Sequence, residues 1–197
     1  EGIIQQFTAK ALGVRTNIGL YSQPSAAAAG NGWSYDGITP SQITGPDGTT
    51  PCPLITAPGG ADILTPTTGQ LYGPGAFTAS IWLRPTTADA VVFLQFCGST
   101  LMYPSLTPNV WQRVVITGTL TQSLQKMLVM VRIAAGKSIG IGPYQIESGS
   151  GATDYIATTS VPATVTGEYA TQATWTAKRG TITSGGLYTA PASGGSD

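Results

Sequence analysis

The feature of this sequence that most constrains its fold is the alternation of apolar and polar side chains with a period of two. Residues 77–85, FTASIWLRP, place every second side chain on one face of an extended strand. The apolar members of that face are Phe77, Ala79, Ile81 and Leu83. Residues 110–120, VWQRVVITGTL, alternate in the same way. Because almost no segment shows the helical period of about 3.6, we predict an all-β, antiparallel fold.

Shorter segments of the same kind predict the remaining strands. Each is bounded by Gly, Pro, Asn or Ser, at the spacing expected of a sandwich or barrel. These segments are residues 91–96, 127–134 and 139–146, with two shorter ones at 19–23 and 54–56. Only residues 121–126 indicate a helical turn, and only weakly.

Composition narrows the class of protein further. The chain has 197 residues, enough for one sizeable domain with or without part of a second. Only 9% of its residues are charged, against about 25% in an average globular protein. Its nine basic and nine acidic residues form no run of either sign, which argues against a nucleic-acid partner. No apolar run approaches the roughly 20 residues of a membrane span, so we expect no membrane insertion.

The residues available for catalysis are few. The chain has no histidine, which excludes Ser-His-Asp and Cys-His triads and histidine-ligated zinc. It has no Gly-x-Ser-x-Gly, Walker or Cys-x-x-Cys motif. Two carboxylates across a cleft would suit a glycosidase, but the acids are scattered in turns, where Asp usually bonds its own backbone. We therefore predict that the chain is not an enzyme.

Metal binding and disulfide formation remain open at this point. Loop carboxylates suit calcium, which prefers oxygen ligands. The candidates for a structural calcium site are Asp36, Asp47, Asp62 and Glu147, although no Asp-x-Asp-x-Asp spacing supports them. Cys52 and Cys97 can form one disulfide or remain two buried thiols.

Aromatic residues give the stronger functional signal. Trp82 and Arg84 share the polar face of residues 77–85, and Trp111 and Arg113 repeat the pairing. Flat rings stack on the apolar faces of sugars while Arg donates hydrogen bonds to hydroxyls, so this pattern predicts a glycan-binding platform. The alternative is that each Trp lies in the core and its Arg covers it. That alternative applies most to Trp111, because both faces of its strand are largely apolar.

Five segments in order carry a family resemblance. They are LYSQPSAAAAGNGW (20–33), GPDGTT (45–50), FTASIWLRP (77–85), WQRVVITGTLT (111–121) and GPYQIESGSGATDYIATT (142–159). Together they resemble the carbohydrate-binding-like jelly-roll modules of phage virion proteins, such as tail fibres and other host-facing parts, and of secreted bacterial proteins. The last segment departs from the family pattern at residues 143–144, Ser148 and Ala157.

The resemblance covers roughly residues 17–159 and concerns architecture rather than catalysis. It implies a jelly-roll β-sandwich in which residues 139–159 form the last strand and its exit. In that arrangement Glu147 caps a turn, and Tyr155 and Ile156 pack back on the sandwich. Pro143 would fit an edge or strand-start position better than a central one.

The two ends of the chain lie outside the jelly-roll resemblance. Residues 1–16 form an N-terminal arm, which could add a strand to a neighbouring subunit or remain a loose leader. Residues 160–197 read as a linker and a partial second β unit. Within them, ATWTAKRGTITSGGLYTAPA (173–192) resembles part of the bacterial immunoglobulin-like domains.

These observations favour a non-catalytic role on an exposed surface over a role in catalysis. The leading hypothesis is a non-catalytic module on a virion surface, or extracellular, that serves host attachment or decoration and binds a bacterial surface glycan. The first alternative is a purely structural virion or filament subunit, which contacts neighbouring subunits and binds no sugar. The second is an accessory carbohydrate-binding module of a secreted polysaccharide-degrading enzyme.

Overall fold

The computed structural model describes residues 10–25, 30–97, 99–102, 105–121, 124–170, 181–182 and 188–189. The chain divides into two compact units, Val14–Val165 and a second made of Glu1–Gly13 with Thr166–Asp197. The described residues form strands and turns without a helix, so none of their segments is a helix that could cross a membrane.

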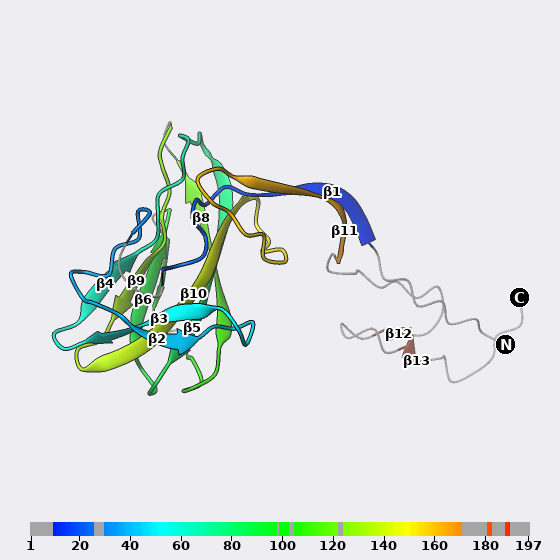
Figure 1. Cartoon of the computed structure of the whole chain (residues 1–197). Helices are drawn as coiled ribbons and strands as arrows, with labels where there is room; N and C mark the ends of the chain where they lie inside the picture. The colour runs from blue at the N-terminus through cyan, green and yellow to red at the C-terminus, as the bar shows by residue number, and fades with distance from the viewer. Residues whose placement is uncertain are drawn as a thin grey trace, which may run out of the picture. The chain divides into compact units, whose positions relative to one another are not determined.

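The larger unit contains two antiparallel sheets (Figure 1). One sheet has the strand order β2, β3, β10, β5, β8 and the other has the order β4, β9, β6, β7. The strands of the first are β2 (Ser41–Thr44), β3 (Pro51–Ala57), β10 (Lys137–Ser148), β5 (Gly75–Pro85) and β8 (Gln112–Leu120). Those of the second are β4 (Ala61–Leu64), β9 (Met130–Ile133), β6 (Val91–Phe96) and β7 (Ser99–Met102).

The connections between these sheets are those of a jelly roll. The chain crosses from β3 to β4, back to β5, over to β6 and β7, back to β8, over to β9, and finally to β10. The last strand, β10, inserts between β3 and β5, which is the interleaving that defines this architecture. The predicted all-β antiparallel sandwich is therefore confirmed, and β6 has the predicted bounds of residues 91–96.

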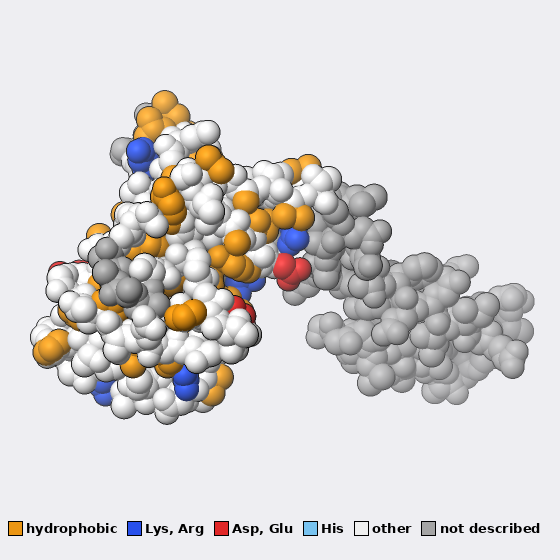
Figure 2. All heavy atoms as spheres, in the orientation of Figure 1, with side chains coloured by type: hydrophobic (Ala, Val, Ile, Leu, Met, Phe, Trp, Pro, Cys, Tyr) orange, Lys and Arg blue, Asp and Glu red, His pale blue; other side chains and the backbone are white. Residues whose placement is uncertain are grey.

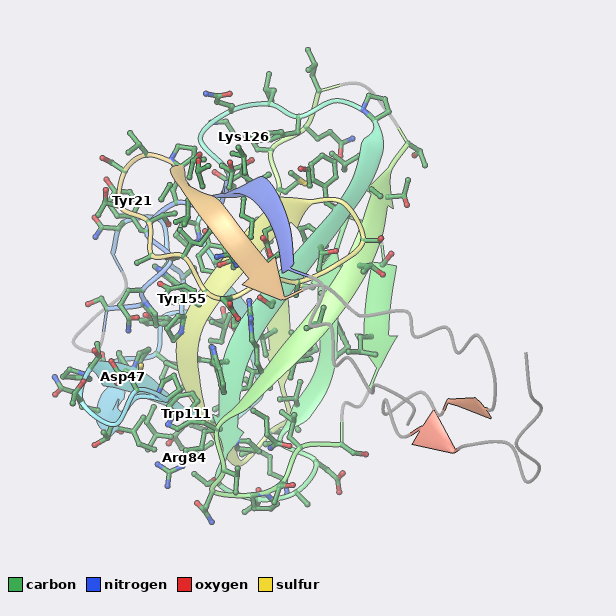
Figure 3. The ribbon with its side chains drawn as sticks, turned by 90° about the vertical axis from the view of Figure 1, so that its right-hand side faces the viewer. Tyr21, Asp47, Arg84, Trp111, Lys126 and Tyr155 are labelled. Carbon is green, nitrogen blue, oxygen red and sulfur yellow. The ribbon has the colours of Figure 1, made fainter. Side chains whose placement is uncertain are left out.

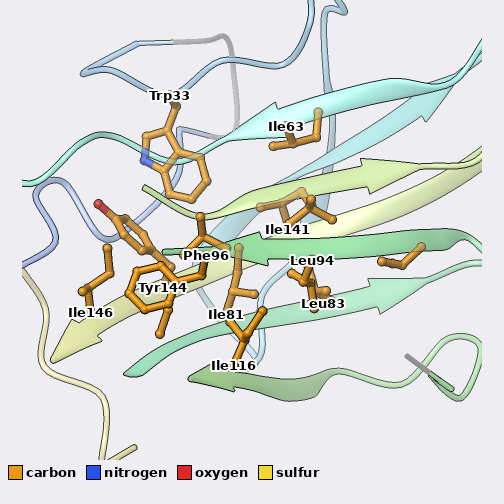
Figure 4. Packing of buried hydrophobic residues seen from close by; sticks show 14 of the residues in the cluster. Trp33, Ile63, Ile81, Leu83, Leu94, Phe96, Ile116, Ile141, Tyr144 and Ile146 are labelled. Carbon is orange, nitrogen blue, oxygen red and sulfur yellow. The ribbon is translucent and has the colours of Figure 1, made fainter. Parts of the chain in front are cut away.

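The core lies between the two sheets, as Figure 4 shows. Strand β5 contributes the apolar set predicted from its alternation, with exposed fractions from 0 to 6%: Phe77, Ala79, Ile81 and Leu83. Strand β10 contributes Ile139, Ile141, Tyr144 and Ile146, all fully buried. The ring of Tyr144 meets that of Trp33 edge to face at 5.3 Å, a favourable geometry for aromatic pairs. Its single hydroxyl proton lies between the carbonyl oxygens of Leu20 (2.8 Å) and Pro66 (3.1 Å), so the buried hydroxyl has an acceptor.

Three local predictions are wrong. Residues 19–23 form no strand, because their backbone groups bond elsewhere: Tyr21 N–H donates to the Thr159 carbonyl and the Ser22 carbonyl accepts from Tyr144 N–H. Residues 121 and 124–126 are described and contain no helical turn. Pro143 lies in a central strand, not at an edge. It falls where the pairing of β10 with β5 shifts register, and a bulge tolerates a residue without an N–H.

The segment after β10 folds back over the sheet, as the family resemblance implies. The Glu147 carboxylate accepts hydrogen bonds from the backbone N–H (3.0 Å) and the hydroxyl of Thr153, so it does cap this turn. The amide of Gln145 accepts from Ile156 N–H (2.6 Å) and donates to the Asp154 carbonyl (3.2 Å). Ile156 is only 6% exposed, so the predicted packing of the exit on the sandwich is confirmed.

A second set of buried polar groups fastens the start of the domain to the same exit. The Asn17 side-chain oxygen accepts from the N–H groups of Gly19 and Ile146, both at 3.0 Å, while its nitrogen donates to the Ile156 carbonyl at 2.7 Å. The Ser22 hydroxyl is hydrogen-bonded to the Tyr155 hydroxyl at 2.7 Å. Three of these four bonds tie residues more than a hundred positions apart, so the motif of the exit is architectural.

The remaining strands form two small sheets. β1 (Lys10–Asn17) pairs with β11 (Ala163–Ala170), so the described part of the N-terminal arm pairs within its own chain. The Thr16 and Thr164 hydroxyls are hydrogen-bonded across this pair at 2.9 Å. β12 (Thr181–Ile182) pairs with β13 (Tyr188–Thr189), and the rest of the immunoglobulin-like segment lies outside the described residues.

Candidate functional site

The outer face of the five-stranded sheet is divided into a covered half and an open half. In the covered half, outward-pointing polar residues of β5 and β10 are at most 5% exposed, because the exit segment lies over them. They are Thr78, Ser80, Gln145 and Glu147. The open half lies further along the same strands, where β5 carries Trp82 and Arg84 and β10 carries Gly140 and Gly142. This open half is the candidate site.

Trp111 lies across the open half. A Cβ atom built at Gly140 would be 3.0 Å from the indole Cη2, and one at Gly142 would be 3.2 Å from Cζ3. The indole therefore occupies the space that side chains at these two positions would need. Its Nε1–H donates to the Thr44 carbonyl at 2.9 Å. Trp111 remains partly exposed, so a ring held in a fixed orientation is presented on the sheet surface.

Trp82 and Arg84 flank this ring on β5. The Trp82 Cβ is 2.8 Å from the position of a Cβ at Gly142, and the Arg84 Cβ is 3.4 Å from that at Gly140. Trp82 is half-buried, and its indole N–H has no hydrogen-bond partner among the described residues. Figure 3 shows Trp111 and Arg84 close together on the face turned toward the viewer. Both tryptophans thus lie on the outer face rather than in the core.

Arg113, the fourth residue predicted for the platform, lies on the same face at the border of the covered half. Its Nε and Nη2 both donate to the Ser80 hydroxyl, at 3.1 and 2.8 Å. Burial lowers the pKa of Arg113, while the nearby Glu147 and Asp154 carboxylates raise it. Its guanidinium bonds a side chain of the same face through two nitrogens, whereas that of Arg84 bonds the protein only through Nε, to the Asn109 carbonyl.

The turn between β2 and β3 supports the far edge of the indole. Asp47 accepts hydrogen bonds from the backbone N–H groups of Thr49 (2.9 Å) and Thr50 (2.8 Å) and from the Thr50 hydroxyl. These bonds hold the pKa of the Asp47 carboxyl well below its usual range. Gly45 N–H donates to the Thr50 carbonyl at 2.8 Å and closes the turn directly after Thr44. The carbonyl that fixes Trp111 is therefore part of a firmly bonded turn.

The four acidic candidates for calcium do not form one site. Asp36 accepts from Asp62 N–H at 3.3 Å, but both carboxylate oxygens of Asp62 face the Arg132 guanidinium, whose hydrogen bonds lower the pKa of Asp62. Asp47 and Glu147 are each held by hydrogen bonds from their own turns. Within the described residues, no group of three or more His, Cys, Asp or Glu side chains is placed to hold a metal ion.

Cys52 and Cys97 are free thiols, so they form no disulfide. Cys52 lies on β3, where its sulfur accepts a 3.5 Å hydrogen bond from the Gln23 amide. Cys97 follows β6 in the other sheet and packs against Gly118. Burial raises the pKa of each thiol to about 11.

The described surface carries few charges. Figure 2 shows one face on which neutral polar and backbone atoms predominate, with apolar patches and scattered charged groups. Neutral hydrogen-bonding groups therefore predominate on this face.

Comparisons with known proteins find similar solved structures only. No family model matches the chain, and neither does any curated protein. TmCBM61, solved with β-1,4-galactotriose, is similar with 12% identity and a TM-score of 0.49, covering 68% of this chain and 99% of its own. The enzymatically active domain of bacteriophage CBA120 tailspike protein 4 has 10% identity and a TM-score of 0.49, covering 66% of this chain and 22% of its own. The CBM22-1 xylan-binding domain from Paenibacillus barcinonensis Xyn10C has 12% identity and a TM-score of 0.40, covering 73% and 99%. Because these TM-scores are below 0.5, the similar structures give no evidence about the role of the open face.

Proposed function

We propose that this chain is a non-catalytic glycan-binding module that acts on the surface of a phage particle, in host attachment or decoration. The observation that carries the proposal is the seating of Trp111 on Gly140 and Gly142 with its nitrogen bonded to Thr44. An indole fixed in this way pays little conformational entropy when a sugar stacks on it. Trp82 and Arg84 supply hydrogen-bond donors beside it, as recognition of sugar hydroxyls requires.

The absence of catalysis is part of the proposal. The chain has no histidine to act as a base. Asp47, next to the open face, and Glu147, under the exit segment, each accept hydrogen bonds at both carboxylate oxygens from their own turns. The virion setting rests on the family resemblance of residues 17–159 to modules of phage virion proteins, a family that also occurs in secreted bacterial proteins.

The test is binding of the chain to a panel of polysaccharides and to intact bacterial envelopes, with Trp111→Ala and Trp82→Ala variants. We expect saturable binding that Trp111→Ala weakens about tenfold, which corresponds to ~1.4 kcal/mol. Val115→Ala is the matched control, because Val115 lies on the same outer face of β8, is 44% exposed and is outside the open half. The control should bind as the unchanged protein does.

Each variant must first be shown to melt as the unchanged protein does, which we expect because both tryptophans lie outside the core. Undiminished affinity in a folded Trp111→Ala variant would exclude the open face as the site. If the unchanged chain binds none of the polysaccharides or envelopes, the glycan proposal is wrong and a purely structural role among neighbouring subunits replaces it.

A further inference from the structure

We propose that the open face selects acidic glycans, with the carboxylate of a uronic-acid residue bound by Arg84 while its pyranose ring stacks on Trp111. This inference rests on the proposed function, because it names the ligand class of the same face.

Arg84 is a cation that the protein orients but does not neutralise. Its Nε–H donates to the Asn109 carbonyl at 3.0 Å, and Asn109 N–H in turn donates to the Pro85 carbonyl at 2.7 Å. The two terminal nitrogens of Arg84 have no hydrogen bond or ion pair among the described residues. A guanidinium held at Nε presents these two nitrogens together, which suits two parallel hydrogen bonds to one carboxylate.

The guanidinium and the ring are close enough to bind one sugar residue together. The Arg84 Cβ and the Trp111 Cη2 approach the same point, the position of a Cβ at Gly140, within 3.4 and 3.0 Å. The carboxylate of a uronic acid is attached directly to the pyranose ring. A ring stacked on the indole therefore brings its carboxylate to the adjacent ring edge, where the Arg84 side chain starts.

The charges at the two ends of the indole also favour one orientation of the ligand. The nitrogen edge points toward Thr44, and the turn that follows Thr44 carries the Asp47 carboxylate, while Arg84 lies on the other side (Figure 3). A ligand carboxylate is repelled at the Asp47 end and attracted at the Arg84 end. The hydroxyls of the sugar then face the turn.

The experiment compares each acidic polysaccharide with its carboxyl-reduced form, which keeps the sugar rings and removes the charge. Polygalacturonate and hyaluronate serve as the acidic probes, in 150 mM salt so that non-specific attraction is screened. We expect at least one acidic polymer to bind at least tenfold more tightly than its reduced form, and Arg84→Gln to abolish that difference. Lys126→Gln removes the same charge from the exposed loop before β9, away from Arg84, and should leave the preference unchanged.

Polyglutamate, which carries carboxylates without a pyranose ring, tests whether charge alone suffices, and we expect it not to compete. Equal binding of acidic and reduced polymers, still lost in Trp111→Ala, would overturn this inference and leave the glycan-binding proposal standing. Loss of the preference in Lys126→Gln as well, or competition by polyglutamate, would show general electrostatic attraction and would also overturn it. Absence of binding to any sugar polymer would overturn both proposals.

Discussion

The arrangement of the open face predicts different effects on stability for two substitutions only two residues apart. Gly140→Ala and Gly142→Ala each add one methyl group to the outer face of β10 beneath the Trp111 indole. At Gly140 the new atom would meet the end of the indole, at 3.0 and 3.3 Å, and the Arg84 Cβ at 3.4 Å. At Gly142 it would meet the Trp82 Cβ at 2.8 Å and the Trp82 carbonyl oxygen at 3.3 Å.

These neighbours differ in how easily they can move. The end of an indole can swing away, which loosens the Nε1 bond to Thr44, and a hydrogen bond of this kind contributes about 1 kcal/mol. The Cβ and carbonyl of Trp82 belong to the paired strand β5 and cannot move alone, so the Gly142 methyl group causes overpacking that costs roughly 1–3 kcal/mol. Alanine in a strand regains roughly 0.5–1 kcal/mol relative to glycine at both sites. The net change is therefore near zero for Gly140→Ala and a destabilisation of about 1–2 kcal/mol for Gly142→Ala.

Thermal unfolding and glycan binding measure the two effects separately. For a domain of this size, about 1 kcal/mol shifts the Tm by roughly 2–4 °C, so Gly142→Ala should lower it by roughly 2–8 °C. Gly140→Ala should keep the Tm within about 2 °C and still weaken glycan binding, because the ring is displaced. Gly59→Ala is the control, since no atom lies within 4 Å of the added methyl group. Equal destabilisation by Gly140→Ala and Gly142→Ala would refute this account of how the Trp111 indole packs on the two glycines.

Two further predictions concern buried groups outside the open face. Asn17→Ala leaves two N–H groups and one carbonyl without their partner. We expect the free energy of unfolding, measured by denaturant titration, to fall by about 3 kcal/mol or more. A loss below about 1 kcal/mol would contradict the role given to Asn17. Burial raises the pKa of Cys52 to about 11 from an ordinary value of 9.0, so native protein at pH 8 should resist alkylation at this thiol until it unfolds. Because the folded pKa is the higher one, the stability contributed by this thiol is complete below pH 9 and declines as the pH rises through about 11. The measurement compares the pH dependence of the Tm for the unchanged protein and for Cys52→Ala between pH 9 and about 11. The same pH dependence in both proteins would contradict this assignment.

The sequence predicts most accurately those features that depend only on residues close together in the chain. Strand β5 was predicted with its core face correct, because alternation over nine residues assigns Phe77 and Leu83 to the interior without reference to any other strand. The exit of β10 was predicted from a resemblance, and its physical basis is a set of buried hydrogen bonds around Gln145 and Glu147. Residues 19–23 have a strand-like pattern but form none, because Tyr21 has a positive φ of 45° and the segment bonds two different parts of the chain, at Tyr144 and Thr159.

The placement of Trp111 could not be read from its own strand. Both faces of residues 110–120 are largely apolar, so alternation leaves the indole free to lie inside or outside. The deciding residues are Gly140 and Gly142, whose missing side chains make room for the ring on another strand. A signal was present, because the run IGIG puts isoleucine on one face and glycine on the other. This signal could be interpreted only with the knowledge that β10 lies next to β5, so that the two glycines face the tryptophans.

The division of the outer face also determines how a glycan can lie on it. A chain running along the strands from the open half would meet Arg113, then the exit segment that covers Gln145 and Glu147. The indole instead extends across the strands, from the start of β8 over β10 to the turn at Thr44. A glycan stacked on it is therefore expected to cross the sheet rather than follow its strands. In the proposed glycan-binding mode, the polar residues that close the fold at the exit therefore restrict the orientation of the glycan from outside the open half.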